Sequence, residues 1–293
     1  MSIHRRITRT VDTPALAPGF IGAGHLMTPV LSIDDYALND PFIMLADDHL
    51  DLGDRPVGGP HPHAGFETVT LLIDGEIFDR DEGGTIRAGE VQWMTAGSGI
   101  IHGENVATRG KVRLLQLWLV LPRSERWATP GFQDIHDAAI PVRREPGATV
   151  RVYSGTSGTA RGPARNHVPV TIVEAVLEPG ASVEQALPAS YNGFVYPISG
   201  DVLAGDDLLP LQVGQVGWLD RPASQGETVL RLSAGPAGAR LVLYAGEPQH
   251  DPIVSHGPFI ADTRDDIVRL FAEYRSNRFI RLSELAHAHG GRA

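Results

Sequence analysis

Three histidines and one glutamate occupy alternate positions in two short segments of the N-terminal half. The segments are His61-Pro62-His63 and His102-Gly103-Glu104. Successive side chains of a β-strand point to opposite faces, so residues two positions apart share a face. If both segments are strands, each presents a pair of metal-ligating side chains, and the two pairs can converge on one ion.

The donor types indicate which ions such a site would hold. Neutral imidazole and carboxylate groups suit divalent first-row ions such as Fe, Mn, Ni, Cu or Zn. Four protein ligands on a six-coordinate ion leave positions open for substrate, water or O2. The chain has no cysteine, which excludes disulfides and a Cys-rich structural zinc site. The pattern favours a catalytic or sensing ion, with His61, His63, His102 and Glu104 as predicted ligands.

The rest of the sequence indicates an all-β protein. The chain has 293 residues, of which 33 are glycine and 22 are proline, so many turns are expected between short strands. Hydrophobic residues at 42% and charged residues at 20% are typical of a globular protein with a sizeable core. Strand-sized apolar runs separated by turn residues are found at Phe42 to Leu45, Thr68 to Ile73, Val91 to Met94 and Leu114 to Leu121.

The two halves of the chain resemble each other, which predicts an internal duplication. Residues 86–94 are echoed by residues 211–219, and Gly65-Phe66 is echoed by Gly193-Phe194. The second copy lacks the ligands. Residues 187–191 contain no histidine, and Gln225-Gly226-Glu227 stands where the first copy has His102-Gly103-Glu104. We therefore expect only the first copy to bind a metal ion.

A domain boundary is predicted near residue 140, which gives domains 1–140 and 141–293. Residues 143–165 are rich in Gly, Pro and Arg and are interpreted as a connection between the halves. Near the C-terminus, Thr263 and Asp266 form a capping-box pattern. Apolar residues follow at the helical period, which predicts a short helix packed on the β body: Ile267, Leu270, Phe271 and Tyr274.

Charge and hydropathy exclude several classes of function. The formal net charge of −10 opposes direct binding to nucleic acid, and the arginines at 123–126 and 143–144 are interpreted as solvated loop charge. No run approaches the roughly 18 apolar residues that a membrane-spanning helix needs. Polar residues and a proline interrupt residues 7–15, so no signal-peptide core is expected and the cytoplasm is the predicted location.

The amino-acid sequence around the two histidine segments resembles that of the pirin family of the cupin superfamily. The segments that carry the resemblance are His61 to Thr70 and Val91 to Glu104. Further segments are similar to that family and follow in the same order: Asp40 to Leu45, Gln116 to Pro122 and Gly257 to Thr263.

The resemblance implies a bicupin, with two stacked jelly-roll-like β-barrels and a short C-terminal helix. It also implies one iron ion in the N-terminal barrel, bound by His61, His63, His102 and Glu104. Many other cupins take their carboxylate ligand from the first motif, at the position of Glu67. Glu67 has the parity of His61 and His63, so an unbulged strand would place it on their face, and both carboxylates stay candidates.

The activity that the resemblance implies is that of an Fe(II)-dependent dioxygenase that uses O2 to cleave a flavonol such as quercetin. Glu104 is then the catalytic base that accepts the proton of the flavonol 3-hydroxyl. This chain departs from the family at Ala64, where an arginine is common, and at Val120, where an asparagine is frequent. The loss of cationic groups near the site is expected to alter which phenolic ligand is accepted.

Two other functions compete with this one. Some pirins are metal-dependent redox sensors that bind and modulate a transcription factor or an enzyme, and the acidic charge fits a protein partner better than DNA. A metal-free structural bicupin is the third possibility. Metal content and turnover of a phenolic substrate distinguish the three.

Overall fold

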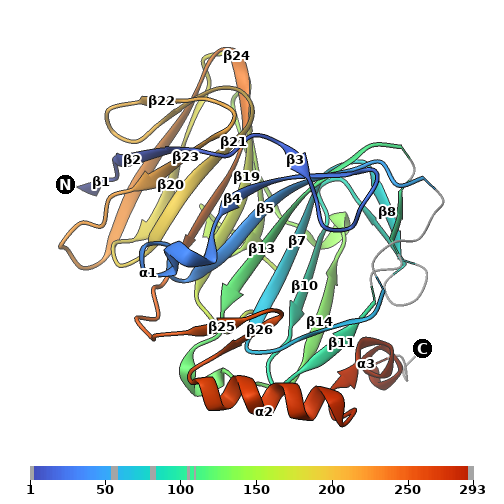
Figure 1. The fold of residues 1–293 in the computed structure, drawn as a ribbon. Helices are drawn as coiled ribbons and strands as arrows, with labels where there is room; N and C mark the ends of the chain where they lie inside the picture. The colour runs from blue at the N-terminus through green and yellow to red at the C-terminus, as the bar shows by residue number, and fades with distance from the viewer. Residues whose placement is uncertain (1–2, 54–58, 80–83, 104–105, 109, 290–293) are drawn as a thin grey trace. The chain divides into compact units, whose positions relative to one another are not determined.

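The chain folds mostly into β-strands with a few short helices, as the computed structural model in Figure 1 shows. The structure describes residues 3–53, 59–79, 84–103, 106–108 and 110–289. The all-β prediction is confirmed. None of the described helices is both long and apolar enough to cross a lipid bilayer.

Two compact units make up the fold, and the chain passes between them more than once. We call the unit that carries the histidine segments the histidine unit and the other the second unit. The histidine unit comprises Ala15–Ala37, Phe42–Asp137 and Gln249–Ala293, and the second unit comprises Met1–Pro14, Leu38–Pro41 and Ala138–Pro248.

The chain leaves the histidine unit at Asp137 and enters the second unit at Ala138, close to the boundary predicted near residue 140. The units differ from domains 1–140 and 141–293 at both ends of the chain, because the terminal strands pair with the more distant half. The N-terminal strands pair within the second unit, and a C-terminal strand pairs with residues 100–101.

The main sheet of the histidine unit runs in the order β14-β10-β7-β13-β5-β4-β3. Its strands are β3 (Ala17–Pro18), β4 (His25–Leu31), β5 (Phe42–Leu50), β7 (Phe66–Asp74), β10 (Val91–Thr95), β13 (Val112–Val120) and β14 (Gly131–Ile135). Smaller sheets join β6 (His61–His63), β11 (Ile100–His102) and β27 (Ile280–Arg281), and also β8 (Glu76–Asp79), β9 (Gly84–Arg87) and β12 (Val106–Thr108). Single-turn helices lie at η1 (Ile33–Asp35), α1 (Tyr36–Asn39), η2 (Arg123–Glu125) and η3 (Asp137–Ala139).

The main sheet of the second unit runs in the order β15-β16-β19-β24-β21-β23-β2. Its strands are β2 (Ile7–Asp12), β15 (Val142–Glu145), β16 (Ala148–Ser154), β19 (Val170–Leu177), β21 (Asn192–Ala204), β23 (Gln215–Leu219) and β24 (Glu227–Gly246). Pairing with this sheet are β1 (Ile3–His4), β20 (Ser182–Pro188) and β22 (Leu209–Leu211), and a separate hairpin joins β17 (Thr156–Ser157) to β18 (Ala160–Arg161).

The strand orders of the two sheets correspond, which agrees with the predicted duplication. In the histidine unit β5, β13, β7 and β10 lie side by side, and β19, β24, β21 and β23 do so in the second unit. The strand beside β10 is β14, which follows it in the chain. The strand beside β23 is β2, which comes from the N-terminus.

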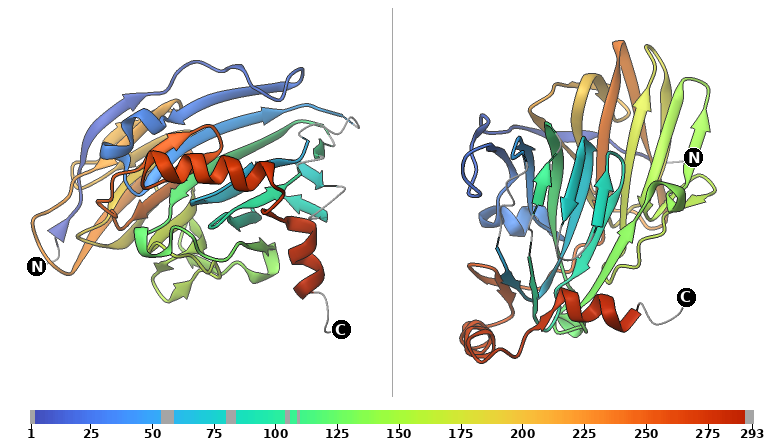
Figure 2. Two further views of the ribbon diagram at one scale, coloured as in Figure 1. Left: turned by 60° about the horizontal axis from the view of Figure 1, so that its bottom comes forward. Right: turned by 90° about the vertical axis from the view of Figure 1, so that its right-hand side faces the viewer.

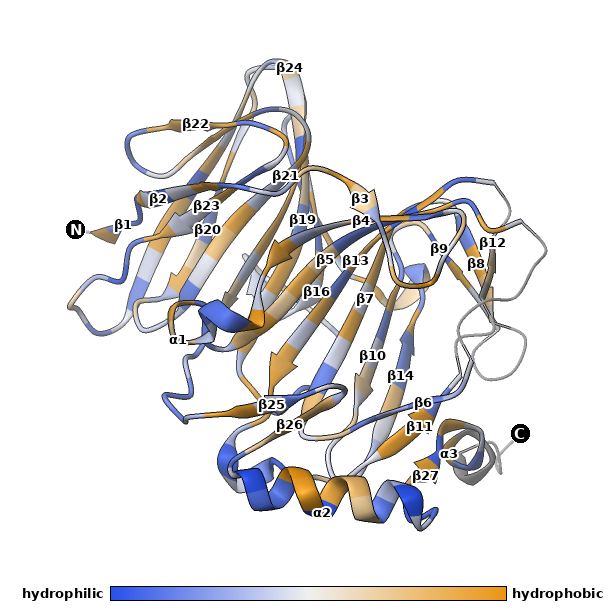
Figure 3. Cartoon of the chain, in the orientation of Figure 1, coloured by the Kyte–Doolittle hydropathy of each residue, from blue (hydrophilic) through white to orange (hydrophobic). Residues whose placement is uncertain are grey.

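Alternating side chains build the core of each unit. In β13, Leu115, Leu117 and Leu119 are fully buried, whereas Gln116 and Trp118 between them are half-buried. Figure 3 shows the resulting change of hydropathy along the strands. Burial of such apolar surface is the main favourable term in folding.

The segment 143–165, predicted to be a connection, instead contributes to the second unit's sheet, so that prediction is wrong. Within it, Val150 and Val152 of β16 are buried in the unit's apolar core. The backbone of β16 pairs with β19. Glycines in the turns and arginines within the strands obscured a strand whose alternate residues are apolar.

The predicted C-terminal helix is confirmed as α2 (Arg264–Arg275), which Figures 1 and 2 show beside the hairpin of β25 (Val254–His256) and β26 (Phe259–Ala261). The Thr263 side chain accepts from the backbone N–H of Asp266, and the Asp266 carboxylate accepts from that of Thr263, which completes the capping box. Ile267 and Leu270 face the β body and are buried with Phe259. A further helix, α3 (Leu282–His289), follows β27.

Candidate metal centre

His61, His63 and His102 come together in the histidine unit. Strands β6 and β11 pair in antiparallel fashion, with His61 directly opposite His102. The ring centroids of His61 and His102 lie 4.2 Å apart, and that of His63 lies 4.8 Å from His61 and 5.0 Å from His102. One nitrogen from each ring can be chosen so that all three lie within 4.8 Å of one another.

The convergence follows from the strand period inferred from the sequence. His61 and His63 are two positions apart in β6, and the antiparallel register brings His102 against the same pair. Glu104, the predicted fourth ligand, lies outside the described residues, so its place in the site stays a prediction. Within the part of the chain that the structure describes, this is the one cluster of three or more metal-ligating side chains.

Burial keeps two of these imidazoles neutral. Removal from water and, to a smaller extent, the neighbouring His61 lower the pKa of His63 to about 3. Burial also holds the pKa of His102 well below its usual value, with His63 and His61 contributing. A neutral imidazole keeps the lone pair that a metal ion requires, so neither ring has to lose a proton to bind one near pH 7.

Backbone carbonyls orient the histidine rings. The Nδ1 of His61 lies 3.0 Å from the carbonyl oxygen of Gly59, and the Nδ1 of His63 lies 3.4 Å from that of Pro258. A ring that donates from Nδ1 to a carbonyl presents an unprotonated Nε2, the arrangement usual for metal-binding histidines. The geometry therefore selects Nε2 as the ligand atom of both rings.

The third ring, that of His102, gives independent evidence that the cluster suits a metal ion. The Nε2 of His102 is buried and has no hydrogen-bond partner among the described residues. A buried polar atom without a partner carries a desolvation cost, which a metal ion would remove. With bonds of about 2.1 Å, two nitrogens on one ion are at most roughly 4.2 Å apart, so the widest pair has to close by no more than about 0.6 Å.

A hairpin from the C-terminal segment supports the His63 strand. Ala64 forms a parallel bridge with Phe259 in β26, and the Ala64 carbonyl accepts from the backbone N–H of Ile260 at 3.0 Å. Gly65 has φ of +87°, and a Cβ there would lie 1.8 Å from the carbonyl oxygen of Ile260. Only glycine permits this approach of two backbones beside the histidine cluster.

Arg126 ties the same turn to the hairpin. Its side chain is fully buried, its Nε donates to Asp262 at 3.1 Å, and its Nη1 donates to the Gly65 carbonyl at 3.3 Å. The interpretation of residues 123–126 as solvated loop charge is therefore wrong for Arg126. Its partner Asp262 is 136 residues away in the sequence, so no local sequence pattern could predict this contact.

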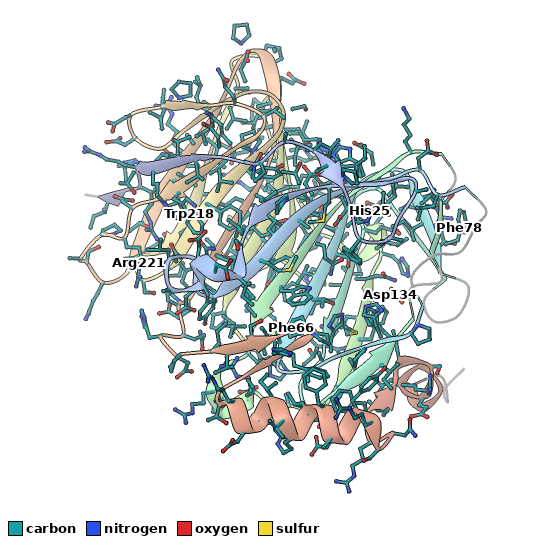
Figure 4. The ribbon with its side chains drawn as sticks, viewed as in Figure 1. His25, Phe66, Phe78, Asp134, Trp218 and Arg221 are labelled. Atoms are coloured by element: carbon teal, nitrogen blue, oxygen red, sulfur yellow. The ribbon has the colours of Figure 1, made fainter. Side chains whose placement is uncertain are left out.

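Aromatic side chains form a wall beside His63. Its ring centroid lies 5.2 Å from that of Phe66 and 5.4 Å from that of Trp118, and those two rings are 4.2 Å apart. Figure 4 labels Phe66, which is the first residue of β7. Phe66 is fully buried and Trp118 is half-buried, so the wall keeps water from one side of the imidazole.

Glu67 is placed away from the histidine cluster. Its side chain is fully buried in β7, opposite Thr95 of β10, and its Oε1 accepts from the Thr95 hydroxyl at 2.7 Å. It is not among the side chains whose ligand atoms converge. The parity argument that kept Glu67 as a candidate ligand fails because a turn through Gly65 separates β6 from β7.

The two departures from the family pattern lie in apolar surroundings. Ala64 is fully buried in a cluster with Ile101 and Phe259, and Val120 is fully buried in a cluster with Phe66 and Ile260. Neither residue is at the surface, because each packs between the sheet and the C-terminal hairpin. That these changes alter which phenolic ligand is accepted stays a prediction.

Comparison with known proteins relates both halves of the chain to one family. A family model described as Pirin matches residues 26–119, and one described as Pirin C-terminal cupin domain matches residues 172–280. Pirin of Rattus norvegicus is 34% identical over 265 residues, which cover 87% of this chain and 88% of the rat protein.

Solved structures share the fold. A Geobacillus kaustophilus protein superposes with a TM-score of 0.77 at 38% identity and covers 86% of this chain and 100% of its own. A quercetin 2,3-dioxygenase of Acinetobacter baumannii superposes with a TM-score of 0.81 at 26% identity, covering 94% of this chain and 98% of its own. The first family model spans all three clustered histidines.

Proposed function

Because this chain belongs to the pirin family, we propose that it is a metal-dependent dioxygenase whose substrate is a flavonol such as quercetin. The observation that carries the proposal is the convergence of three imidazoles, two of them buried and neutral, on one point of the histidine unit. The similarity to a quercetin 2,3-dioxygenase over 94% of the chain supports the choice of substrate.

The three histidines would hold one divalent ion, which we propose to be Fe(II). Mn, Ni, Cu and Zn suit the same donors. A bound iron would supply electrons for O2 chemistry and a positive charge that stabilises a phenolate. The predicted fourth ligand is Glu104.

The protein's own groups have three tasks in this reaction. The Gly59 and Pro258 carbonyls fix the tautomer and direction of His61 and His63. Phe66 and Trp118 exclude water on the side of His63, and the half-buried Trp118 is proposed to offer apolar surface to an aromatic substrate. Glu104 is proposed to accept the proton of the flavonol 3-hydroxyl, which gives the anion. The overall reaction consumes one O2 and opens the central ring with loss of CO.

The test is aerobic turnover of quercetin by the iron-loaded full chain, followed by loss of the flavonol absorbance and release of CO. The variant Glu104→Gln keeps the size of the side chain and removes the base. We expect it to abolish turnover while the metal content stays close to that of the wild type. Absence of turnover in the iron-loaded wild type would contradict the proposal.

A redox-sensing role is the second candidate, and it rests on the same cluster. The ferrous and ferric forms of one site differ in charge, and the net charge of −10 suits a protein partner rather than nucleic acid. Iron-state-dependent binding of a transcription factor or enzyme, without flavonol turnover, would support this role.

A further inference from the structure

The second unit contains a cavity of about 940 Å³ in its own sheet and turns. One wall is the connection from β16 to β19, which includes the β17–β18 hairpin. Further lining comes from the end of β20, the turn after it, and the turn between β23 and β24. Pockets that hold small molecules commonly have volumes of about 300–1,000 Å³, so the space suits a ligand of metabolite size.

The cavity occupies the place in the second copy that the histidine cluster occupies in the first. By the repeat in the sequence, residues 187–191 correspond to the His61-Pro62-His63 segment, and Gln225-Gly226-Glu227 corresponds to His102-Gly103-Glu104. Tyr191 and all three residues of the second triplet line the cavity. At this place the second copy therefore has a cavity and lacks the metal-ligating side chains of the first copy.

The charged groups on the walls favour an anion. Arg161 and Arg165 line the cavity from the β16–β19 connection, and Glu227 is the carboxylate among the lining side chains. Arg161 forms no ion pair with any residue that the structure describes. A guanidinium presents paired donors that match a carboxylate, whereas Glu227 would repel a ligand with two negative charges.

The remaining lining groups suit a ligand with an apolar body. Pro169, Val170 and Pro188 provide apolar wall. Burial, together with the charge of Glu247, raises the pKa of Tyr191, so its hydroxyl keeps its proton and can donate. The Oγ of Ser224 is shielded from solvent without a hydrogen-bond partner among the described residues, and its residue lines the same cavity.

We propose that this cavity binds a small organic monocarboxylate with an aromatic or apolar body, held through Arg161. The inference does not depend on the proposed dioxygenase activity, since every residue that carries it belongs to the second unit.

The test is calorimetric titration of the full chain with 4-hydroxybenzoate, phenol and inorganic phosphate. We expect saturable binding of 4-hydroxybenzoate, with much weaker binding of phenol, which lacks the carboxylate, and of phosphate, which lacks the apolar body. Arg161→Gln should weaken 4-hydroxybenzoate binding by about tenfold or more, as expected for loss of a charge-assisted hydrogen bond. The matched control is Arg231→Gln, which removes the same charge from an exposed position of β24 outside the cavity.

A second arm separates this site from the histidine cluster, because carboxylates also bind metal ions. Binding of 4-hydroxybenzoate should persist in His63→Ala, and amide hydrogen exchange should slow in residues 186–191 and 224–227. The proposal is overturned if no carboxylate binds, if Arg161→Gln binds as tightly as Arg231→Gln, or if binding disappears in His63→Ala. Equal affinity for phosphate would replace the proposed ligand class with inorganic anions and would also overturn it.

Discussion

The carbonyl oxygen of Pro258 lies 3.4 Å from the Nδ1 of His63, although 195 residues separate the two in the chain. The C-terminal hairpin, which belongs to the histidine unit, thus orients one of the metal-ligating rings. The hairpin also forms a bridge to Ala64 and approaches Gly65. The metal centre therefore depends on a segment outside both histidine motifs.

Loss of one clustered histidine should remove the metal. His63→Ala takes away one of three converging nitrogens, and we expect the metal content of purified protein to fall from near one ion per chain to near none. Elemental analysis of protein given ferrous salt under anaerobic conditions measures this. The control is His4→Ala, at an exposed position in β1. Equal metal content in His63→Ala and His4→Ala would disprove the role of the cluster.

Glu67 should be dispensable for metal binding. Its carboxylate accepts from Thr95 and stands apart from the three converging rings. Glu67→Gln keeps an acceptor for the Thr95 hydroxyl, so we expect an unchanged metal content and a folded protein. Elemental analysis beside His63→Ala, which is expected to lose the metal, makes the comparison. A large loss of metal in Glu67→Gln would return this residue to the ligand set.

Gly65→Ala should destabilise the histidine unit strongly. The substitution combines a left-handed backbone with a Cβ placed 1.8 Å from the Ile260 carbonyl, so the hairpin has to move. We expect a loss of more than about 3 kcal/mol in the free energy of unfolding, together with weaker metal binding. Gly257→Ala is the matched control: its φ is +56° with open space around it, and it should cost only about 1 kcal/mol. Similar melting temperatures for the two variants would contradict the argument.

Two arginines that share one carboxylate should differ in their contribution to stability. Arg126 is fully buried and lies 3.1 Å from Asp262, whereas the side chain of Arg123 is 63% exposed and lies 3.9 Å from it. We expect Arg126→Gln to cost about 3–5 kcal/mol, because it removes the buried partner of a largely buried carboxylate and leaves only the exposed Arg123 beside it. Arg123→Gln should cost at most about 1 kcal/mol. Denaturant unfolding measures both, and a comparable cost for the two would refute this account.

The cap of α2 should give a pH-dependent part of the stability. The Thr263 hydroxyl and, to a smaller extent, Arg269 lower the pKa of Asp266 below its usual 3.8. A pKa that is lower in the folded state stabilises the fold above the unfolded pKa, and this contribution is lost as the pH falls through the folded value.

We therefore expect Thr263→Ala to cost about 0.5–2 kcal/mol at pH 7 and less at a pH below that usual value. Thr263→Ser keeps the hydroxyl and should behave like the wild type. Unfolding curves at both pH values measure the difference, and a cost that does not change with pH would argue against the cap as its source.

The sequence predicted the parts of this structure that depend on local periodicity. The alternation in His61-Pro62-His63 placed two rings on one face, and the Thr263 and Asp266 pattern placed the start of α2. These predictions succeeded because strand and helix periods act over a few residues. The echo between residues 86–94 and 211–219 likewise matched corresponding strands in the two units.

Features that depend on contacts between distant segments escaped prediction. Arg126 looked like loop charge because its partner Asp262 lies far along the chain. The exchange of terminal strands between the units was also missed, since pairing of β2 with β23 leaves no mark in either segment alone. Glu67 has the same parity as His61 and His63, but it lies in β7 and not in β6. The turn at Gly65 separates the two strands, so parity does not carry over from one to the other.

The pairing of β2 with β23 has a practical consequence for handling this protein. A shortened chain that begins after residue 14 would leave the backbone N–H and C=O groups of β23 exposed as a bare sheet margin. Such margins recruit other chains and drive aggregation. Removal of the N-terminal residues would therefore lower the solubility of the protein by exposing β23 of the second unit, although it removes none of the metal-ligating side chains.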